Sequence, residues 1–340
     1  MTRRARLLVV VAAACILAAP PAAAAQPAER VLRVGYLSPF SAFDPQVQHS
    51  LDILRQAFRE LGHVEGQGFA IERRWADGKY ERLPRLAAEL VQAKVDVIIT
   101  VGGLPSAQAA QKATRTIPLV VTGTVDPVEA GLIASLARPG GNITGPTIIA
   151  EALVAKQLEL LTEVVPKVSR VAVLWNSSNP GNARQLRAAE AAVPGLRVRL
   201  AARPIRLQPV GVRDSGELDK AFGAMTRQRA DALLVLVDAI LMAEREKIAA
   251  LAVRHHLPAV FGFRTHAEAG GLLAYGANRV ELIRQAAVYA SKILKGAKPA
   301  DLPVEQPTKF ELLINLKTAQ ALGLKIPQSV LLRADEIIEK

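Results

Sequence analysis

Residues 95–106 read VDVIITVGGLPS, and this stretch decides the fold. Val95–Thr100 is a short apolar run bounded by turn residues, as in a strand that is buried on both faces. The glycines Gly102 and Gly103 follow it, and Pro105–Ala113 is an alanine-rich helix that a proline opens. A buried strand that leads through glycines into a helix is one unit of a parallel α/β sheet.

The same alternation extends outward through the first half of the chain. Apolar residues from Val47 to Leu61 are spaced by four, three, four and three positions, which places them on one face of a helix that ends at Gly62. Together with the stretch above, the pattern predicts strand Val31–Leu37, helix Val47–Leu61, strand Phe69–Trp75, helix Leu83–Val91 and strand Ile117–Thr122.

The second half repeats this order. The predicted elements are strand Arg170–Trp175, helix Asn182–Val193, strand Leu196–Ala202, helix Glu217–Arg229, strand Ala232–Val237, helix Ile240–His256 and strand Pro258–Phe261. Matching landmarks recur at a near-constant offset: Asp96 with Asp231, Arg33 with Arg170 and Pro118 with Pro258. The chain therefore contains two similar α/β halves.

Strands that alternate with helices pair in parallel, because a parallel pair needs a crossover of a dozen or more residues. We predict an α/β fold of two similar doubly wound parallel-sheet lobes joined by three crossovers. Glycine- and proline-rich stretches at 139–146, 269–276 and 299–309 mark the junctions. The first lobe is expected to span 31–145, with 272–297 and 310–340 returning to it and a closing helix over Leu312–Leu322, and the second lobe 146–271.

The first residues have the three-part layout of a secretory signal peptide. Arg3, Arg4 and Arg6 precede an apolar run, Leu7–Ala19, and small residues end at Ala25. Two prolines interrupt the run before it is long enough for a membrane anchor. We expect residues 1–25 to be removed on export to the periplasm.

Cys15 is the only cysteine of the chain and lies inside this apolar run. Its removal leaves a mature protein without a thiol, which excludes disulfides, zinc clusters and cysteine nucleophiles. Lipidation of Cys15 is the alternative, because Ala13 and Ala14 are small, although Ala12 stands where such signals usually carry leucine.

The sequence is basic, with 43 Lys and Arg against 31 Asp and Glu and a formal net charge of +12. The basic residues are scattered with few aromatic residues among them, and no zinc-finger spacing or helix-turn-helix precedes the first strand, so we expect no nucleic-acid partner. The sequence has no nucleophile elbow, no His-Glu-x-x-His motif, no phosphate-binding glycine-lysine loop and no dinucleotide-type glycine triplet. We expect a monomer without enzyme activity, cofactor or metal.

Ligands of open parallel sheets bind beyond the carboxyl ends of the strands, where loops and helix N-termini meet. In the first half this rule selects Ser41, Gly102, Pro105, Ser106, Thr122 and Asp126. The glycines let the backbone approach a ligand, and the free N–H groups of the helix that follows suit an anion, so we expect Ser106 and Thr122 to hold a ligand carboxylate. Helix capping is the alternative role of Ser106 and of Asp126, which precedes a predicted helix over Val128–Ala137.

In the second half the same rule selects Trp175, Asn176, Asp238, Phe261 and Tyr275. Asp238 and Asn176 are expected to meet the amine or polar end of the ligand, with capping of the next helix as the alternative for Asp238. The three aromatic residues are expected to form walls for a flat or apolar group. Core packing is the alternative for each of them.

Several longer phrases resemble the ABC transporter substrate-binding family that includes tryptophan- and tyrosine-binding lipoproteins. They are Arg59–Gly66, Arg82–Pro84, Asp126–Val128, Ser135–Gly145, Ala269–Gly271, Lys292–Pro303 and Thr308–Leu312. The resemblance runs from Val31 to the end of the chain. It departs from the family at Gly103-Leu104-Pro105-Ser106, where members usually read Gly-Thr-Pro-Ala, so the hydroxyl group is displaced.

The resemblance implies a type I periplasmic-binding fold whose two lobes close on a ligand, with an ABC permease and its ATPase as partners. It also implies an amino acid as the ligand, aromatic ones included. The expected function is the extracytoplasmic solute-binding component of an importer. The alternatives are a ligand-sensing subunit for a membrane signalling partner and a secreted enzyme on a similar scaffold.

Overall fold

The computed structural model of the chain describes residues 31–148, 150–200 and 205–339. The expected signal peptide, with Cys15, lies outside these residues. Leu32–Lys340 forms one compact unit, which contains two larger sheets and a small one. No helix within the described ranges has both the length and the apolar character needed to cross a bilayer.

The first sheet is parallel throughout and has the strand order β2-β3-β1-β4-β5-β7. The chain enters it in the interior, at β1, and adds strands on both sides, as in doubly wound folds. Its strands are β1 (Leu32–Ser38), β2 (Val64–Glu65), β3 (Gly68–Trp75), β4 (Val97–Thr100), β5 (Leu119–Val121) and β7 (Ile143–Thr144). The small sheet pairs β6 (Thr124–Val125) with β8 (Thr147–Ile148).

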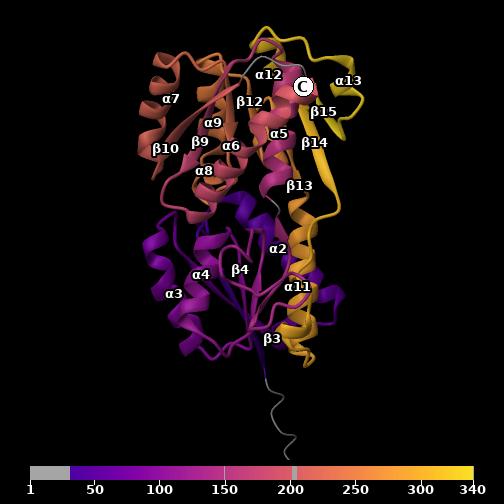
Figure 1. Cartoon of the computed structure of the whole chain (residues 1–340). Coiled ribbons are helices and arrows are strands. Elements are labelled where there is room, and N and C mark those ends of the chain that lie inside the picture. The colour runs from indigo at the N-terminus through magenta and orange to yellow at the C-terminus, as the bar shows by residue number, and fades with distance from the viewer. Residues whose placement is uncertain (1–30, 149, 201–204, 340) are drawn as a thin grey trace, which may run out of the picture. The chain divides into compact units, whose positions relative to one another are not determined.

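Helices cover both faces of the first sheet (Figure 1). They are α2 (Pro45–Glu60) and α11 (Arg279–Leu294) on one face, and α3 (Leu83–Gln92), preceded by the 3₁₀ turn η1 (Tyr80–Arg82), and α4 (Leu104–Ala113) on the other. Successive side chains of a strand point to opposite faces, so Val34 and Tyr36 of β1 pack with α2 and α11, whereas Leu37 packs with α3 and α4. The apolar run of β4 is buried on both sides, as predicted.

The second sheet has the order β10-β9-β11-β12-β13-β14-β15 and is parallel except for the antiparallel pair of β13 and β14. Its strands are β9 (Arg170–Asn176), β10 (Arg206–Val212), β11 (Ala232–Val235), β12 (Ala259–Phe261), β13 (Leu273–Ala277), β14 (Phe310–Asn315) and β15 (Glu336–Ile338).

Helices cover both faces of this sheet as well. One core contains α5 (Ala150–Val164), α6 (Pro180–Leu200), α12 (Leu316–Ala321) and α13 (Gln328–Leu331), and the opposite core contains α7 (Leu218–Arg227), α8 (Ala239–Ala243) and α9 (Arg245–Arg254). The remaining elements are α10 (Arg264–Glu268) and the 3₁₀ turns η2 (Ser215–Glu217) and η3 (Pro299–Asp301). The α/β class with parallel sheets is therefore confirmed.

The chain passes between the two larger sheets three times, after β8, after β13 and before β14. Because the chain starts in the first sheet and crosses an odd number of times, its last strands lie in the second sheet, where β14 and β15 pair. The predicted return of residues 310–340 to the first lobe is therefore wrong. Of residues 272–297, β13 also belongs to the second sheet, and α11 packs with the first. The lobe boundaries at 31–145 and 146–271 stay predictions.

Three predicted elements are wrong in type or place. Residues 196–200 of the strand expected at Leu196–Ala202 are helical instead, because α6 continues to Leu200, and the next described strand is β10, an edge strand that tolerates Pro209. The helix expected at Leu312–Leu322 begins only at Leu316, since the run before it is the buried strand β14.

The third error concerns Val128–Ala137, which forms turns and bends instead of a helix. Gly131 lies in the left-handed region at φ 70° and Asp126 at φ 45°, conformations that interrupt a helix. Asp126 therefore has no helix to cap. The helix expected over Ile240–His256 is divided at Glu244 into α8 and α9.

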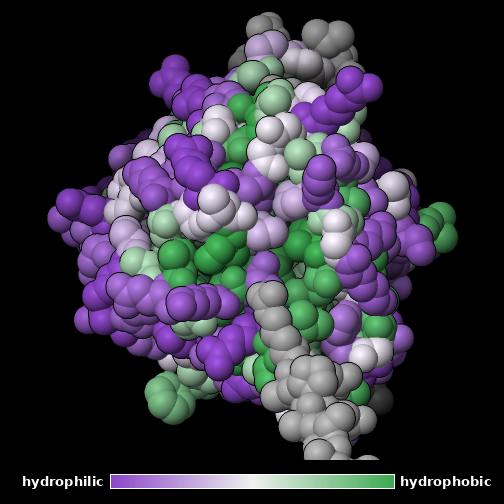
Figure 2. Space-filling view, turned by 90° about the horizontal axis from the view of Figure 1, so that it is seen from below, coloured by the Kyte–Doolittle hydropathy of each residue, from purple (hydrophilic) through white to green (hydrophobic). Residues whose placement is uncertain are grey.

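Hydrophilic residues dominate the rim of the face that Figure 2 shows, and apolar residues gather near its middle. The exposed large apolar side chains of the described residues are dispersed along the sequence, from Val31 to Ile337. Single exposed apolar residues of this kind are ordinary on a folded surface.

Strands β12 and β13 approach each other closely where they end. A Cβ atom on Gly276 would lie 1.8 Å from the carbonyl oxygen of Gly262. Gln157 of α5 ties the same two strand ends together, because its Nε2 donates to the carbonyl oxygens of Tyr275 at 2.8 Å and Phe261 at 3.5 Å. This contact fixes the direction in which the chain leaves β13 for α11.

Replacement of Gly276 by Ala should lower the free energy of unfolding by about 1–3 kcal/mol, since the added methyl group has no space. Gly223→Ala is the matched control: it lies within α7, its Cβ would meet nothing closer than Arg227 Nη1 at 3.5 Å, and it should raise stability by about 0.5–1 kcal/mol. Urea unfolding measures both. Equal midpoints for the two variants would contradict this packing.

Candidate ligand-binding cavity

A cavity lies where strands of both larger sheets end. Its lining follows the carboxyl ends of β4 (Val101–Leu104), β5 (Thr122 and Gly123), β11 (Val237–Ala239) and β13 (Arg279). This is the position at which open parallel sheets bind ligands. The space free of protein atoms, open solvent at its mouth included, is about 720 Å³.

The walls of the cavity are mostly apolar. Two aromatic residues, Phe40 and Phe263, come from loops after β1 and β12, and Tyr36 comes from β1 itself. The other apolar residues are Val101, Leu104, Val125, Val237, Ala239, Met242, Leu282 and Ile283. A cavity of this composition suits a ligand with a sizeable apolar body and few polar groups.

The loop before α4 depends on its two glycines. Gly102 and Gly103 have φ angles of 79° and 86°, in the region that residues with a side chain rarely adopt. A Cβ atom on Gly102 would lie 2.2 Å from Cγ of Pro39. The glycines therefore let the loop turn sharply beside the cavity, where α4 begins. The N–H groups in the first turn of a helix have no partner within the helix.

The buried hydroxyl groups of Thr100, Ser106 and Thr122 have no hydrogen-bond partner among the residues that the structure describes. Only Thr122, which is 8% exposed, also lines the cavity. A buried hydroxyl without a partner costs free energy. A polar group of a ligand would satisfy the Thr122 hydroxyl.

The carboxylate of Asp238, 6% exposed, lies at the cavity wall and accepts hydrogen bonds from five groups. The donors are the backbone N–H groups of Ile240 and Leu241, the amides of Asn176 and Asn179, and the hydroxyl of Tyr80. A carboxylate has about four lone-pair sites. Its acceptor capacity is therefore used within the protein.

The loop that carries Asp238 is fixed from α6. The side chains of Asn182 and Gln185 both donate to the carbonyl oxygen of Val237, at 2.8 and 2.9 Å, and the Val237 N–H donates back to Gln185 Oε1. Side chains thus replace strand pairing beyond the end of β11. The loop is held in a single position at the cavity wall.

The polar contacts between the two halves of the chain include those of Tyr80 and Arg245, besides the ion pairs of Glu129 with Arg184 and Arg187. The Tyr80 hydroxyl of η1 lies 2.9 Å from Asp238 Oδ2, and burial followed by the nearby Asp238 charge raises the pKa of Tyr80 well above its usual value. Arg245 of α9 pairs with Asp44, which caps α2, at 3.2 Å, and both side chains are nearly buried. Ion pairs with such low exposure resist screening by salt.

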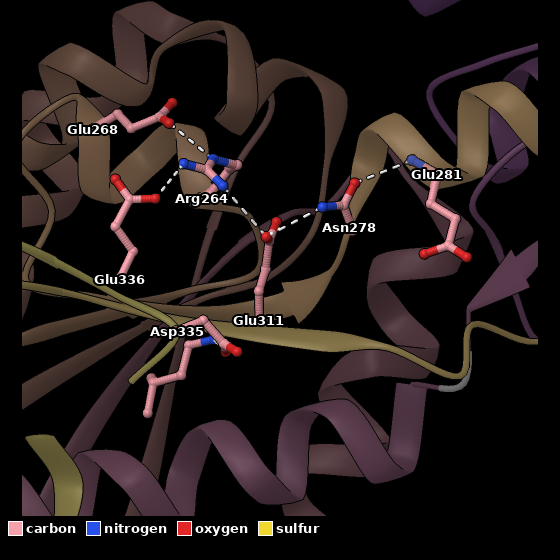
Figure 3. Close-up of polar contacts among 8 residues, drawn as sticks. Arg264, Glu268, Asn278, Glu281, Glu311, Asp335 and Glu336 are labelled. Carbon is pink, nitrogen blue, oxygen red and sulfur yellow. Dashed lines mark hydrogen bonds and ion pairs between the residues drawn. The ribbon is translucent and has the colours of Figure 1, made fainter. Parts of the chain in front are cut away.

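Arg279 is the first residue of α11 and lines the cavity. Its guanidinium carbon lies 5.7 Å from the centre of the Phe40 ring, a cation–π contact. The turn before it is anchored by Asn278, whose Oδ1 accepts from the Glu281 N–H and whose Nδ2 donates to Glu311. Arg264 holds Glu311 from the other side and also contacts Glu268 and Glu336 (Figure 3).

Of the residues selected from the sequence, Gly102, Thr122 and Asp238 line the cavity. Asn176 is fully buried behind Asp238, and Ser106, also fully buried, lies outside the lining with Pro105. Ser41 and Asp126 border other surface hollows. The structure therefore brings together two loops from the first half, after β4 and β5, and one from the second, after β11, with fewer hydroxyl groups than expected.

The three aromatic residues selected from the sequence do not line the cavity. Phe261 is fully buried and stacks on His266, Tyr275 stacks on Phe310, and Trp175 packs beside Gly211 of β10. All three rings pack in or against the cores of the second sheet, which is the alternative role stated for them above.

The residues missed from the sequence are Tyr36, Phe40, Phe263, Asn179, Gln185 and Arg279. Phe40 and Phe263 lie in strand-end loops that the rule had reached. Arg279 also follows the end of a strand, β13. No strand was predicted at Leu273–Ala277, so the strand-end rule did not lead to Arg279.

Groups of side chains suited to a metal ion are absent from the ranges that the structure describes. The catalytic motifs looked for in the sequence are absent too. The cavity offers hydrogen bonds, one cation and apolar walls, which are the means of binding a molecule.

Comparison with known proteins gives consistent results. A family model described as "ABC transporter substrate binding protein" matches residues 44–338. A tyrosine-binding protein of Clostridioides difficile (strain R20291) is 28% identical over 284 residues, which cover 82% of this chain and 79% of that protein.

Two solved structures are similar over nearly all of their length. The ABC domain in complex with L-Trp from Streptococcus pneumoniae is 25% identical, with a TM-score of 0.79, covering 90% of this chain and 99% of that one. A conserved domain protein from Vibrio cholerae is 27% identical, with a TM-score of 0.81, covering 91% and 100%.

The buried His266 generates a pH prediction. Burial, to which the positive charges of Arg245 and Arg279 add, lowers the pKa of His266 from 6.5 to about 4. In the unfolded chain the His266 imidazole binds a proton below pH 6.5, whereas in the folded chain it does so only near pH 4. The free energy of unfolding therefore keeps its full value above pH 6.5 and falls as the pH is lowered from 6.5 to 4. His266 should account for a loss of about 2 kcal/mol between pH 7 and pH 5.

His266→Phe keeps a ring on Phe261 and removes the titration. Urea unfolding at pH 7 and pH 5 should show a smaller pH-dependent loss in this variant than in the wild type. An identical loss in the two proteins would show that His266 does not titrate as described.

Proposed function

We propose that this chain, which belongs to the ABC transporter substrate-binding protein family, captures a small molecule in this cavity outside the cytoplasm. It then delivers the molecule to an ABC importer. Members of the family are substrate-binding proteins and not enzymes. The chain acts as a monomer after export to the periplasm and removal of residues 1–25. The importer's permease and ATPase are its partners.

The observation that carries this proposal is the composition of the cavity. Strand-end loops of both sheets contribute to one lining, so a single ligand contacts both. Only contacts made to both sheets can shift an equilibrium between open and closed arrangements, because a ligand that binds each arrangement equally shifts nothing. The ligand therefore signals its presence to the importer through the arrangement of the two halves.

The class of ligand that we propose is an amino acid with an apolar side chain, aromatic ones included. The apolar walls with Tyr36, Phe40 and Phe263 support a large apolar body. Relatives also support it, since one is named a tyrosine-binding protein and another was solved in complex with L-Trp.

Mass spectrometry of the protein purified under native conditions should show one bound small molecule per chain, and isothermal titration should detect binding of L-tryptophan or L-tyrosine. A strain that lacks the chain should lose uptake of the bound compound. Turnover of that compound by the protein, or undiminished uptake in the deletion strain, would contradict the importer role.

Thr122 and Thr100 provide a matched pair of variants. Both hydroxyl groups are buried without a partner, and only Thr122 lines the cavity. Thr122→Val should weaken binding about 2- to 10-fold, the value of one hydrogen bond, whereas Thr100→Val should leave it unchanged. Equal affinities of both variants and the wild type would remove Thr122 from the site.

A further inference from the structure

Arg279 differs from the other cations near the cavity because its charge is not neutralised by the protein. Arg245 has Asp44 as its partner at 3.2 Å. Within residues 31–148, 150–200 and 205–339, no hydrogen bond or ion pair joins the Arg279 guanidinium to another residue, and its guanidinium carbon lies 5.7 Å from the centre of the Phe40 ring. The residue is half-buried, so its charge loses part of its hydration without a counterion to replace it.

The surroundings of Arg279 raise this cost. Burial lowers its pKa and the charge of Arg245 acts in the same direction, while Tyr36 and Asp44 act against it. Arg279 also occupies the N-terminus of a 16-residue helix, where the helix dipole disfavours a cation. An anion placed in the cavity would relieve each of these unfavourable interactions.

The described residues that line the cavity include no acidic group free to bind a ligand amine. Asp238 is the only Asp or Glu among the described residues that line it, and its carboxylate already accepts hydrogen bonds from five donors. The cavity thus presents an available positive charge and a negative charge that is already in use. Its charges match a carboxylate better than an amine.

The backbone that carries Arg279 is fixed before any ligand arrives. Asn278 caps α11 and is bound by Glu311, which Arg264 holds in turn (Figure 3). The start of α11 is therefore held at the cavity, and a guanidinium there has the geometry to bind both oxygens of a carboxylate.

We propose that Arg279 binds the carboxylate of the ligand, and that this carboxylate is required for binding while the amine of an amino acid is dispensable. The inference rests on the proposed function, because it assumes that the cavity holds the transported molecule. It extends the ligand class from amino acids to apolar organic acids without an amine.

Isothermal titration of the full mature protein with L-tryptophan, 3-indolepropionate and tryptamine separates the two groups of the ligand. L-Tryptophan and 3-indolepropionate should bind within about 10-fold of each other, and tryptamine, which lacks the carboxylate, should bind at least about 10- to 100-fold more weakly. This comparison uses only the wild-type protein and does not depend on the folding of a variant.

Arg279→Met should weaken binding of both acids by about 10- to 100-fold, and Arg279→Lys should restore part of the loss because it keeps the charge. Arg85→Met is the control, since it makes the same change on the exposed surface of α3, where the side chain is 67% accessible, and it should bind like the wild type. Circular dichroism confirms that each variant is folded.

The outcomes distinguish this inference from the function on which it rests. If the acids bind the wild type and Arg279→Met equally well, or if tryptamine binds as tightly as the acids, the role of Arg279 is refuted and the binding function stands. If none of the three compounds binds the wild type, both the ligand class proposed above and the present inference are refuted.

Discussion

The carboxylate of Asp238 is the interaction on which the cavity depends. It caps α8, holds the side chains of Asn176 and Asn179, and accepts from Tyr80 of η1 in the first half of the chain. A buried charge is tolerated when hydrogen bonds surround it, and here the surrounding donors come from several strand-end loops. One buried charge therefore fixes the loops that follow β9 and β11 and connects them to η1, which gives the cavity a defined wall.

The rest of the cavity takes its character from the contrast between Asp238 and Arg279. The negative charge is balanced by the protein, so it has a structural role, whereas the positive charge faces a space that a small molecule can enter. Apolar walls strengthen this preference, because an electrostatic interaction is stronger when little water is present. Family membership identifies the chain as a substrate-binding protein, and the charges of its cavity indicate which substrates suit it.

Much of this architecture could be predicted from the sequence, and the errors have physical causes. Val97–Thr100 and Ala232–Val235 are strands buried on both faces, and their apolar runs predicted this. β10 was misplaced because Pro209 and Gly211 disguise an edge strand, and β14 because a buried strand next to a helix has no periodicity that separates the two. In the site, position relative to strand ends located Gly102, Thr122 and Asp238. Sequence could not show that Asp238 is saturated or that Arg279 lacks a partner, because both facts depend on which distant side chains meet.

The central claim is that one small ligand is bound by loops of both sheets at once. Hydrogen–deuterium exchange with and without saturating ligand, either the co-purified compound or L-tryptophan, tests it most directly. We expect the ligand to slow exchange in residues 101–107 of the first half and in residues 237–242 and 279–283 together. Protection confined to the loops of one sheet, or located away from all of these segments, would contradict the account.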